Sequence, residues 1–358
     1  MSEVGLPSAS LLAAALAVLE PRFNPSSGLL GHVLEAVALF LIPATVLVVV
    51  HHAEAVAHRV GEPFGTLVLT LAVTAIEASV IVSMMLDHTG NPTLARESIF
   101  STVMVVCAGV IGICLTLGGW RHVHQDIKRQ GTSAFLSMLI ALAGFILVLP
   151  NFTVGGGSGG LAPIQLAFIA TLAFLLYISF LVAQARRHRD DFISDGAAAA
   201  HPAPPERSLI YSVVLLLAGL IGVVVLTERV AIAIEERLID MQIGQADAII
   251  GALVATIVLM PESIAAIKAA MRNELQRSLN IALGSACATI GLTVPVVSAV
   301  NLFVGGELIL GLVPRDMVLL TIALATCVVS FTTGRTTVLT DLVHLVVFLA
   351  YLLLIAVP

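Results

Sequence analysis

Long apolar runs, bounded by charged residues, glycine or proline, occupy most of this chain. Across the 358 residues there are eleven, over 7–21, 28–50, 64–86, 99–119, 134–150, 162–183, 209–230, 247–270, 279–301, 315–332 and 338–357. A helix needs about 20 mostly apolar residues to cross a bilayer. The ten later runs, of 17 to 24 residues, therefore predict membrane-spanning helices. The first run, of 15 residues, predicts a short helix that crosses or lies at the interface.

The composition leaves little material for a soluble domain. Hydrophobic residues make up 58% of the chain and charged residues 11%, whereas soluble domains carry about 45–50% and about 25%. The net charge of −6 is spread over short loops, so we expect no nucleic-acid partner. The predicted fold class is an all-α polytopic membrane protein of about eleven helices surrounded by lipid. The sequence indicates no particular oligomeric state.

The basic residues predict which side of the membrane each loop faces, because cytoplasmic loops carry an excess of Lys and Arg. One set of alternating loops has only five, at Arg22, Arg96, Arg229, Arg237 and Arg315. The other set has twelve, at Arg59, Arg121, Lys128, Arg129, Arg186, Arg187, Arg189, Arg207, Lys268, Arg272, Arg277 and Arg335. The sequence thus predicts a cytoplasmic N-terminus and an external C-terminus in a bacterial plasma (inner) membrane.

A polar stretch rich in Ala, Pro and Arg, over 184–208, predicts a cytoplasmic linker. It separates an N-terminal helix (1–27) and a first five-helix unit (28–183) from a second five-helix unit (209–358). Short matches recur between the units: Ser98 and Cys107 return as Ser278 and Cys287, 180 positions later. Because five is odd, the second unit would be inverted relative to the first, as in many secondary transporters.

Two acidic residues fall near the middle of predicted spans. Glu77 is residue fourteen of the run over 64–86, and Glu262 is residue sixteen of the run over 247–270. An ionised carboxylate at that depth costs about 2.5–3.5 kcal/mol and normally faces a cavity or partner. The pair should therefore either hold protons or share a cation. The alternative is a structural role, with each group protonated and bonded to a neighbouring helix.

Oxygen-bearing side chains lie near both carboxylates, and Pro261 removes a backbone N–H beside Glu262, which should bend that helix and free carbonyl groups. Hard cations such as Ca²⁺ and Na⁺ prefer oxygen ligands. We therefore predict Glu77 and Glu262 as the cation- and proton-binding residues. Ordinary hydrogen bonding between helices is the alternative role for the hydroxyl groups. The predicted supporting residues are Thr74, Ser101, Thr102, Pro261, Ser263, Ser285 and Thr289.

Three stretches resemble the Ca²⁺/H⁺ antiporters of the cation exchanger family, within the Ca²⁺/cation antiporter superfamily, and most of all its bacterial sodium-potassium/calcium proton antiporter branch. They are HHAEAVAHRVGEPFGTLVLTLAV, LMPESIAAIKAAMRNELQRSLNIALGSACATIGLTVPVV and SFTTGRTTVLTDLVH. The resemblance covers about residues 50 to 355. It implies eleven helices, two inverted repeats around the ion site, and movement of the first helix of each repeat as a pair. It also implies that Glu77 and Glu262 bind the cation and exchange protons.

The chain departs from the G-N-A-x-E pattern of the eukaryotic-type members. Thr74 and Leu259 stand where that pattern has asparagine. Loss of an amide oxygen in the second repeat favours Na⁺ or K⁺ over strict Ca²⁺ selectivity.

We therefore predict a secondary active antiporter rather than an enzyme. It would export Ca²⁺, Na⁺ or both, with K⁺ as a further candidate, in exchange for H⁺ and without a cofactor. The first alternative is a Na⁺/Ca²⁺ exchanger without proton coupling. The second is an intramembrane enzyme, for which the predicted spans contain no adjacent Asp pair, no Ser/His arrangement and no zinc motif.

Overall fold

The structure is a computed structural model that describes residues 29–60, 64–86, 92–122, 125, 127–154, 159–184, 209–241, 245–332, 334 and 338–357. The predicted short helix over 7–21 lies outside these residues, as does nearly all of the predicted linker over 184–208.

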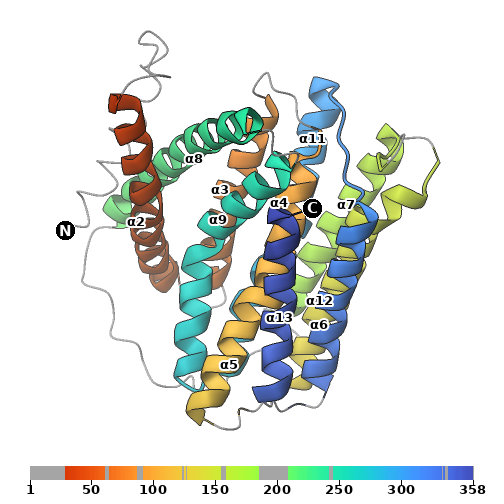
Figure 1. The fold of residues 1–358 in the computed structure, drawn as a ribbon. Coiled ribbons are helices and arrows are strands. Elements are labelled where there is room, and N and C mark those ends of the chain that lie inside the picture. The colour runs from red at the N-terminus through yellow and green to blue at the C-terminus, as the bar shows by residue number, and fades with distance from the viewer. Residues whose placement is uncertain are drawn as a thin grey trace.

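Helices make up almost all of the described chain (Figure 1). The first part contains α2 (Leu29–Val60), α3 (Phe64–Leu86), α4 (Leu94–Met104), η2 (Val105–Val110), α5 (Ile111–His122), α6 (Arg129–Ala143), η3 (Gly144–Val148), η4 (Leu149–Phe152) and α7 (Pro163–Val182). The second part contains α8 (Leu209–Asp240), α9 (Ala246–Met271), α10 (Leu275–Ala288), η7 (Thr289–Thr293), α11 (Val294–Val304), α12 (Pro314–Thr332) and α13 (Val338–Ala356).

Six helical segments of the described chain are long and apolar enough to cross a membrane, and a bent pair within α9 makes a seventh. Three shorter apolar stretches lie in α2, α3 and α13. Together they correspond to the ten longer apolar runs. The predicted all-α polytopic membrane fold is therefore confirmed.

Several helices extend beyond the predicted runs. α2 continues to Val60 and α8 to Asp240, each ten residues past the predicted end. The additions contain Ala, Glu and Arg, which favour helix even where the chain is too polar for the bilayer core. The predicted helix over 99–119 begins earlier, at Leu94, and its added first turn contains the ion pair of Arg96 and Glu97.

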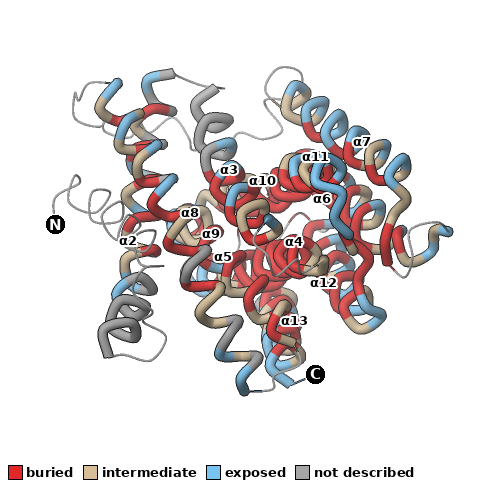
Figure 2. The backbone as a smooth tube through the Cα atoms, turned by 90° about the horizontal axis from the view of Figure 1, so that it is seen from above, coloured by how far each residue is buried: buried red, intermediate tan, exposed pale blue. Residues whose placement is uncertain are grey.

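The buried hydrophobic side chains of the described residues form two clusters. The larger joins α4, η2, α5, α6, α10, α12 and α13. A separate cluster joins α2 and α8 to α3 and α9, and its members include Val49, Ile76 and Val223. In Figure 2 the buried residues gather around α4 and α10, while α7 lies at the edge. Exposed apolar side chains on α7, such as Ile164 and Phe168, form a surface suited to lipid.

Three of the segments given above, η2, η3 and η7, are π-helical. η2 continues α4 into α5, and η7 continues α10 into α11, so each interrupts one long helix of the central cluster. Single π-helical turns inside α-helices occur frequently at functional sites.

Candidate cation-binding site

Glu77 lies in the middle of α3 and is 3% exposed. Its two carboxylate oxygens accept hydrogen bonds from different helices. Thr102 of α4 donates to Oε1 at 3.2 Å, and Thr289 at the start of η7 donates to Oε2 at 2.6 Å. Since a buried carboxylate is stable only when it is hydrogen-bonded or neutralised, these two hydroxyl groups fix its position.

Glu262 lies in α9, directly after the point where that helix bends. The axes of Ala246–Met260 and Glu262–Met271 differ by 55°. Pro261, between them, has no N–H for the helical hydrogen bond, and this accounts for the bend. Glu262 accepts a short hydrogen bond from the hydroxyl group of Ser285 in α10.

The two carboxylates are neighbours because they bind consecutive turns of one helix. Ser285 and Thr289 are four residues apart, which places them on the same face at about 5–6 Å between their Cβ atoms. Ser285 holds Glu262 and Thr289 holds Glu77, so the two acids are anchored one turn apart on the same helix. α3, α4, α9 and the α10–η7 helix therefore meet at one acidic site near the middle of the bundle.

The other predicted supporting residues form no hydrogen bond to the two carboxylates within the described part of the chain. Thr74 is buried in α3 one turn before Glu77, and Pro261 lies at the bend in α9. Ser101 is also buried, but its hydroxyl group has no hydrogen-bond partner within the described part of the chain. Ser263 donates to the Leu259 carbonyl at 2.7 Å. The structure thus joins Thr102, Ser285 and Thr289 to the carboxylates by hydrogen bonds, whereas the hydroxyl of Ser263 bonds to its own helix.

The ligand atoms that these side chains offer to a cation are carboxylate and hydroxyl oxygens. Among the described residues, no group of three or more His, Cys, Asp or Glu side chains is placed to hold a metal ion. A cation here would instead meet two carboxylates and nearby hydroxyl groups. A hydroxyl oxygen can contact a cation while its hydrogen is donated to a carboxylate, so the same groups suit the ion and the empty site.

Comparison with known families agrees with this architecture. The chain matches the sequence profile of the family described as sodium/calcium exchanger protein over residues 31–186 and again over 211–357. The chain belongs to this exchanger family. Its fold and its membership make it an integral membrane transport protein and not an enzyme.

Relatives of this exchanger are similar over nearly their whole length. It is 42% identical to the ionic transporter y4hA of Sinorhizobium fredii over 339 residues, covering 92% of both chains. It is 36% identical to the sodium-potassium/proton antiporter ChaA of Escherichia coli over 330 residues, covering 89% of this chain and 87% of that one. The solved structure of native YfkE covers 100% of both chains with a TM-score of 0.74 at 19% identity, which shows the shared fold.

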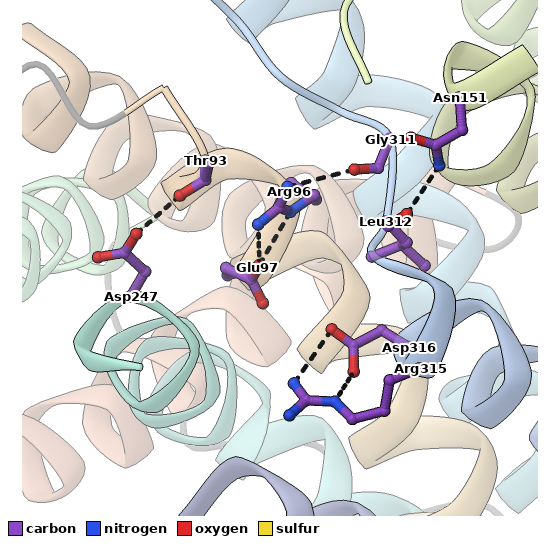
Figure 3. Close-up of polar contacts among 9 residues, drawn as sticks. All are labelled: Thr93, Arg96, Glu97, Asn151, Asp247, Gly311, Leu312, Arg315 and Asp316. Atoms are coloured by element: carbon purple, nitrogen blue, oxygen red, sulfur yellow. Dashed lines mark hydrogen bonds and ion pairs between the residues drawn. The ribbon is translucent and has the colours of Figure 1, made fainter. Parts of the chain in front are cut away.

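A second polar cluster lies where α4, α9 and α12 begin and α13 ends (Figure 3). None of its residues is among the predicted site residues. Arg96 pairs with Glu97 at 2.6 Å and donates to the Gly311 carbonyl at 3.2 Å. Arg315 pairs with Asp316 at 2.9 Å and also reaches the Leu354 carbonyl. These contacts join the ends of helices that are far apart in sequence.

The same cluster fixes the first half of α9 against α4. Thr93 donates to Asp247 at 2.7 Å, and one turn further along α9, Gly251 lies against the backbone of Glu97. A Cβ at Gly251 would lie 2.8 Å from the Glu97 carbonyl carbon, so only glycine permits this approach. The sequence signal for this cluster is an arginine–acid dipeptide near the start of two apolar runs, 96–97 and 315–316.

Proposed function

We propose that this exchanger is a secondary active antiporter that exports Ca²⁺, Na⁺ or both, with K⁺ as a further candidate, in exchange for H⁺. The observation that carries the proposal is the attachment of Glu77 and Glu262 to consecutive turns of the α10–η7 helix. Two neighbouring carboxylates inside a membrane require compensating positive charge. Protons supply it in one state and the transported cation in the other, so the two substrates compete for one site.

The choice of cation is supported by the residues beside the acids. Leu259, one turn before Glu262, is an apolar member of the central hydrophobic cluster and offers no side-chain oxygen. Fewer fixed oxygen ligands favour a monovalent ion over a strict Ca²⁺ site. The 36% identity to an antiporter named for sodium, potassium and proton exchange supports the same assignment.

We propose that access to the site alternates by movement of α2 and α8 as a pair. These two helices pack against each other, and together with parts of α3 and α9 they form a hydrophobic cluster distinct from the larger one. Two inverted five-helix repeats, over 28–183 and 209–358, would relate the two helices by symmetry. The proposal is supported by the family match in each half and by the similar placement of η2 and η7.

We further propose that the protein resides in the bacterial plasma (inner) membrane, with its N-terminus and the linker over 184–208 in the cytoplasm and its C-terminus outside. The distribution of Lys and Arg among the loops supports this orientation. The bacterial origin of both sequence relatives supports the choice of membrane.

The test is proton movement driven by cations in everted membrane vesicles. After respiration acidifies the vesicle lumen, addition of Na⁺, K⁺ or Ca²⁺ should restore the fluorescence of a ΔpH-sensitive dye with the wild-type protein. Glu77→Gln and Glu262→Gln should each abolish the response at equal protein levels. Glu307→Gln, which changes an exposed acid outside the site, is the matched control and should respond as the wild type does.

Two results would contradict the proposal. Undiminished proton movement in both site variants would remove these carboxylates from the mechanism. Exchange of Na⁺ for Ca²⁺ without any change in lumenal pH would instead identify an exchanger without proton coupling.

A further inference from the structure

A buried imidazole on α13 contacts the π-helical segment η2. His344 of α13 is 0% exposed. Gly109 and Gly112 have no side chain, so α13 can pack closely against them. A Cβ at Gly112 would lie 3.0 Å from the His344 Cβ. α13 therefore lies directly against η2 and the start of α5.

Both ring nitrogens of His344 have defined partners. Nδ1 lies 2.8 Å from the Cys107 carbonyl oxygen in η2, and Nε2 lies 3.0 Å from the Ser330 hydroxyl oxygen in α12. A carbonyl oxygen only accepts, so Nδ1 carries the hydrogen, and in the neutral ring Nε2 accepts from Ser330. His344 thus joins α13 to α12 and to η2.

The contact with η2 bears on the ion site through the chain itself. η2 begins three residues after Thr102, the residue that donates to Glu77 at 3.2 Å. Hydrogen bonds in a π-helical turn span five residues, so the position of such a turn depends on partners for its displaced carbonyl groups. His344 supplies a donor to one of them, and the Cys327 thiol approaches the same oxygen at 3.6 Å.

We propose that His344 is a positioning residue of the ion site: by donating Nδ1–H to the Cys107 carbonyl, it holds η2 and thereby keeps Thr102 on Glu77. Ser330 sets the tautomer by donating to Nε2. This role rests on the proposed function of Glu77, but it concerns cation affinity and not proton coupling. In this role His344 acts through η2 and does not itself contact the two carboxylates.

The test separates this role from ordinary packing by comparing substitutions at one position. His344→Leu removes the donor, whereas His344→Asn places an amide N–H near the position of Nδ1. His122→Leu is the matched control, because His122 also bonds a backbone carbonyl, that of Met271 at 3.0 Å, at the opposite, exposed end of α5. Uptake into proteoliposomes containing equal amounts of folded protein gives the apparent KM and the maximal rate for Na⁺ and Ca²⁺.

We expect His344→Leu to raise the apparent KM about fivefold, the equivalent of one neutral hydrogen bond, while the maximal rate changes less than twofold. His344→Asn should restore the KM to within twofold of the wild type, and His122→Leu should match it. If His344→Leu fails to fold, Ser330→Ala provides the measurement, and it should raise the KM in the same direction.

An unchanged KM in folded His344→Leu would overturn the proposal, as would an unchanged KM in Ser330→Ala when His344→Leu does not fold. Equal impairment of the Leu and Asn variants would also overturn it, because packing alone would then explain the effect. Failure of the proposed function is distinguishable, since it would appear as wild-type protein that moves cations without protons.

Discussion

Thr289→Val tests the link between the two halves of the site most sharply. The substitution keeps the shape of the side chain and removes the hydroxyl group that donates to Glu77 Oε2 at 2.6 Å. Thr102, at 3.2 Å, forms the longer of the two bonds. Both residues are buried, so water does not readily replace a lost hydroxyl group.

The expected magnitude follows from the charge on Glu77 in the cation-bound state. A hydrogen bond to a charged group contributes about 1.5–3 kcal/mol. At about 1.4 kcal/mol per tenfold change, Thr289→Val should weaken cation binding about ten- to hundredfold. Thr102→Val should have a smaller effect, since its bond, at 3.2 Å, is longer than the about 2.5–3.0 Å usual for O–H···O bonds.

The assay is cation uptake into proteoliposomes at fixed pH with the cation concentration varied. Thr256→Val is the matched control, because Thr256 is exposed on α9 and donates only to the Ala252 carbonyl of its own helix. The control should keep the wild-type KM. A KM within twofold of the wild type in Thr289→Val, or an equal increase in Thr256→Val, would refute the role assigned to this hydroxyl group.

Three further substitutions test the elements that position the site. Pro261→Ala should restore a helical N–H, reduce the 55° bend of α9 and lower the transport rate in folded protein; a wild-type rate would contradict the role of the bend. Gly251→Ala should destabilise the protein by about 1–3 kcal/mol because its Cβ would meet the Glu97 backbone. Gly144→Ala, whose Cβ meets nothing within 4 Å, is its control in thermal unfolding. Arg96→Gln should cost about 3–5 kcal/mol by leaving buried Glu97 without its partner, whereas Arg277→Gln, in a partly exposed pair with Glu274, should cost less than about 1 kcal/mol. Equal unfolding temperatures within either pair would contradict these assignments.

The sequence predicted the helices well because hydrophobic length decides what can cross a bilayer. It also singles out Glu77 and Glu262 as candidates, since these acids stand isolated in apolar surroundings. The sequence does not show which hydroxyl group bonds to which of the two acids. Ser285 and Thr289 were predicted as supporting residues, but only the three-dimensional packing assigns Thr289 to Glu77, 212 positions away, and Ser285 to Glu262.

Other features could not be predicted because they depend on contacts between distant segments. No local pattern marks η2 as π-helical, and the bond from His344 to the Cys107 carbonyl spans 237 positions. The count of Lys and Arg over alternating loops predicts only that Arg96 lies in an external loop. Its burial with Glu97 and its bond to the Gly311 carbonyl required knowledge of where the loop before α12 returns.

The central claim is that Glu77 and Glu262 form one site that holds either protons or a cation. Its most direct test is the release of protons when Na⁺ or Ca²⁺ is added to purified protein in weakly buffered detergent solution. The account predicts saturable release by the wild type and none by Glu77→Gln or Glu262→Gln. Release of normal size and affinity from either variant would contradict it.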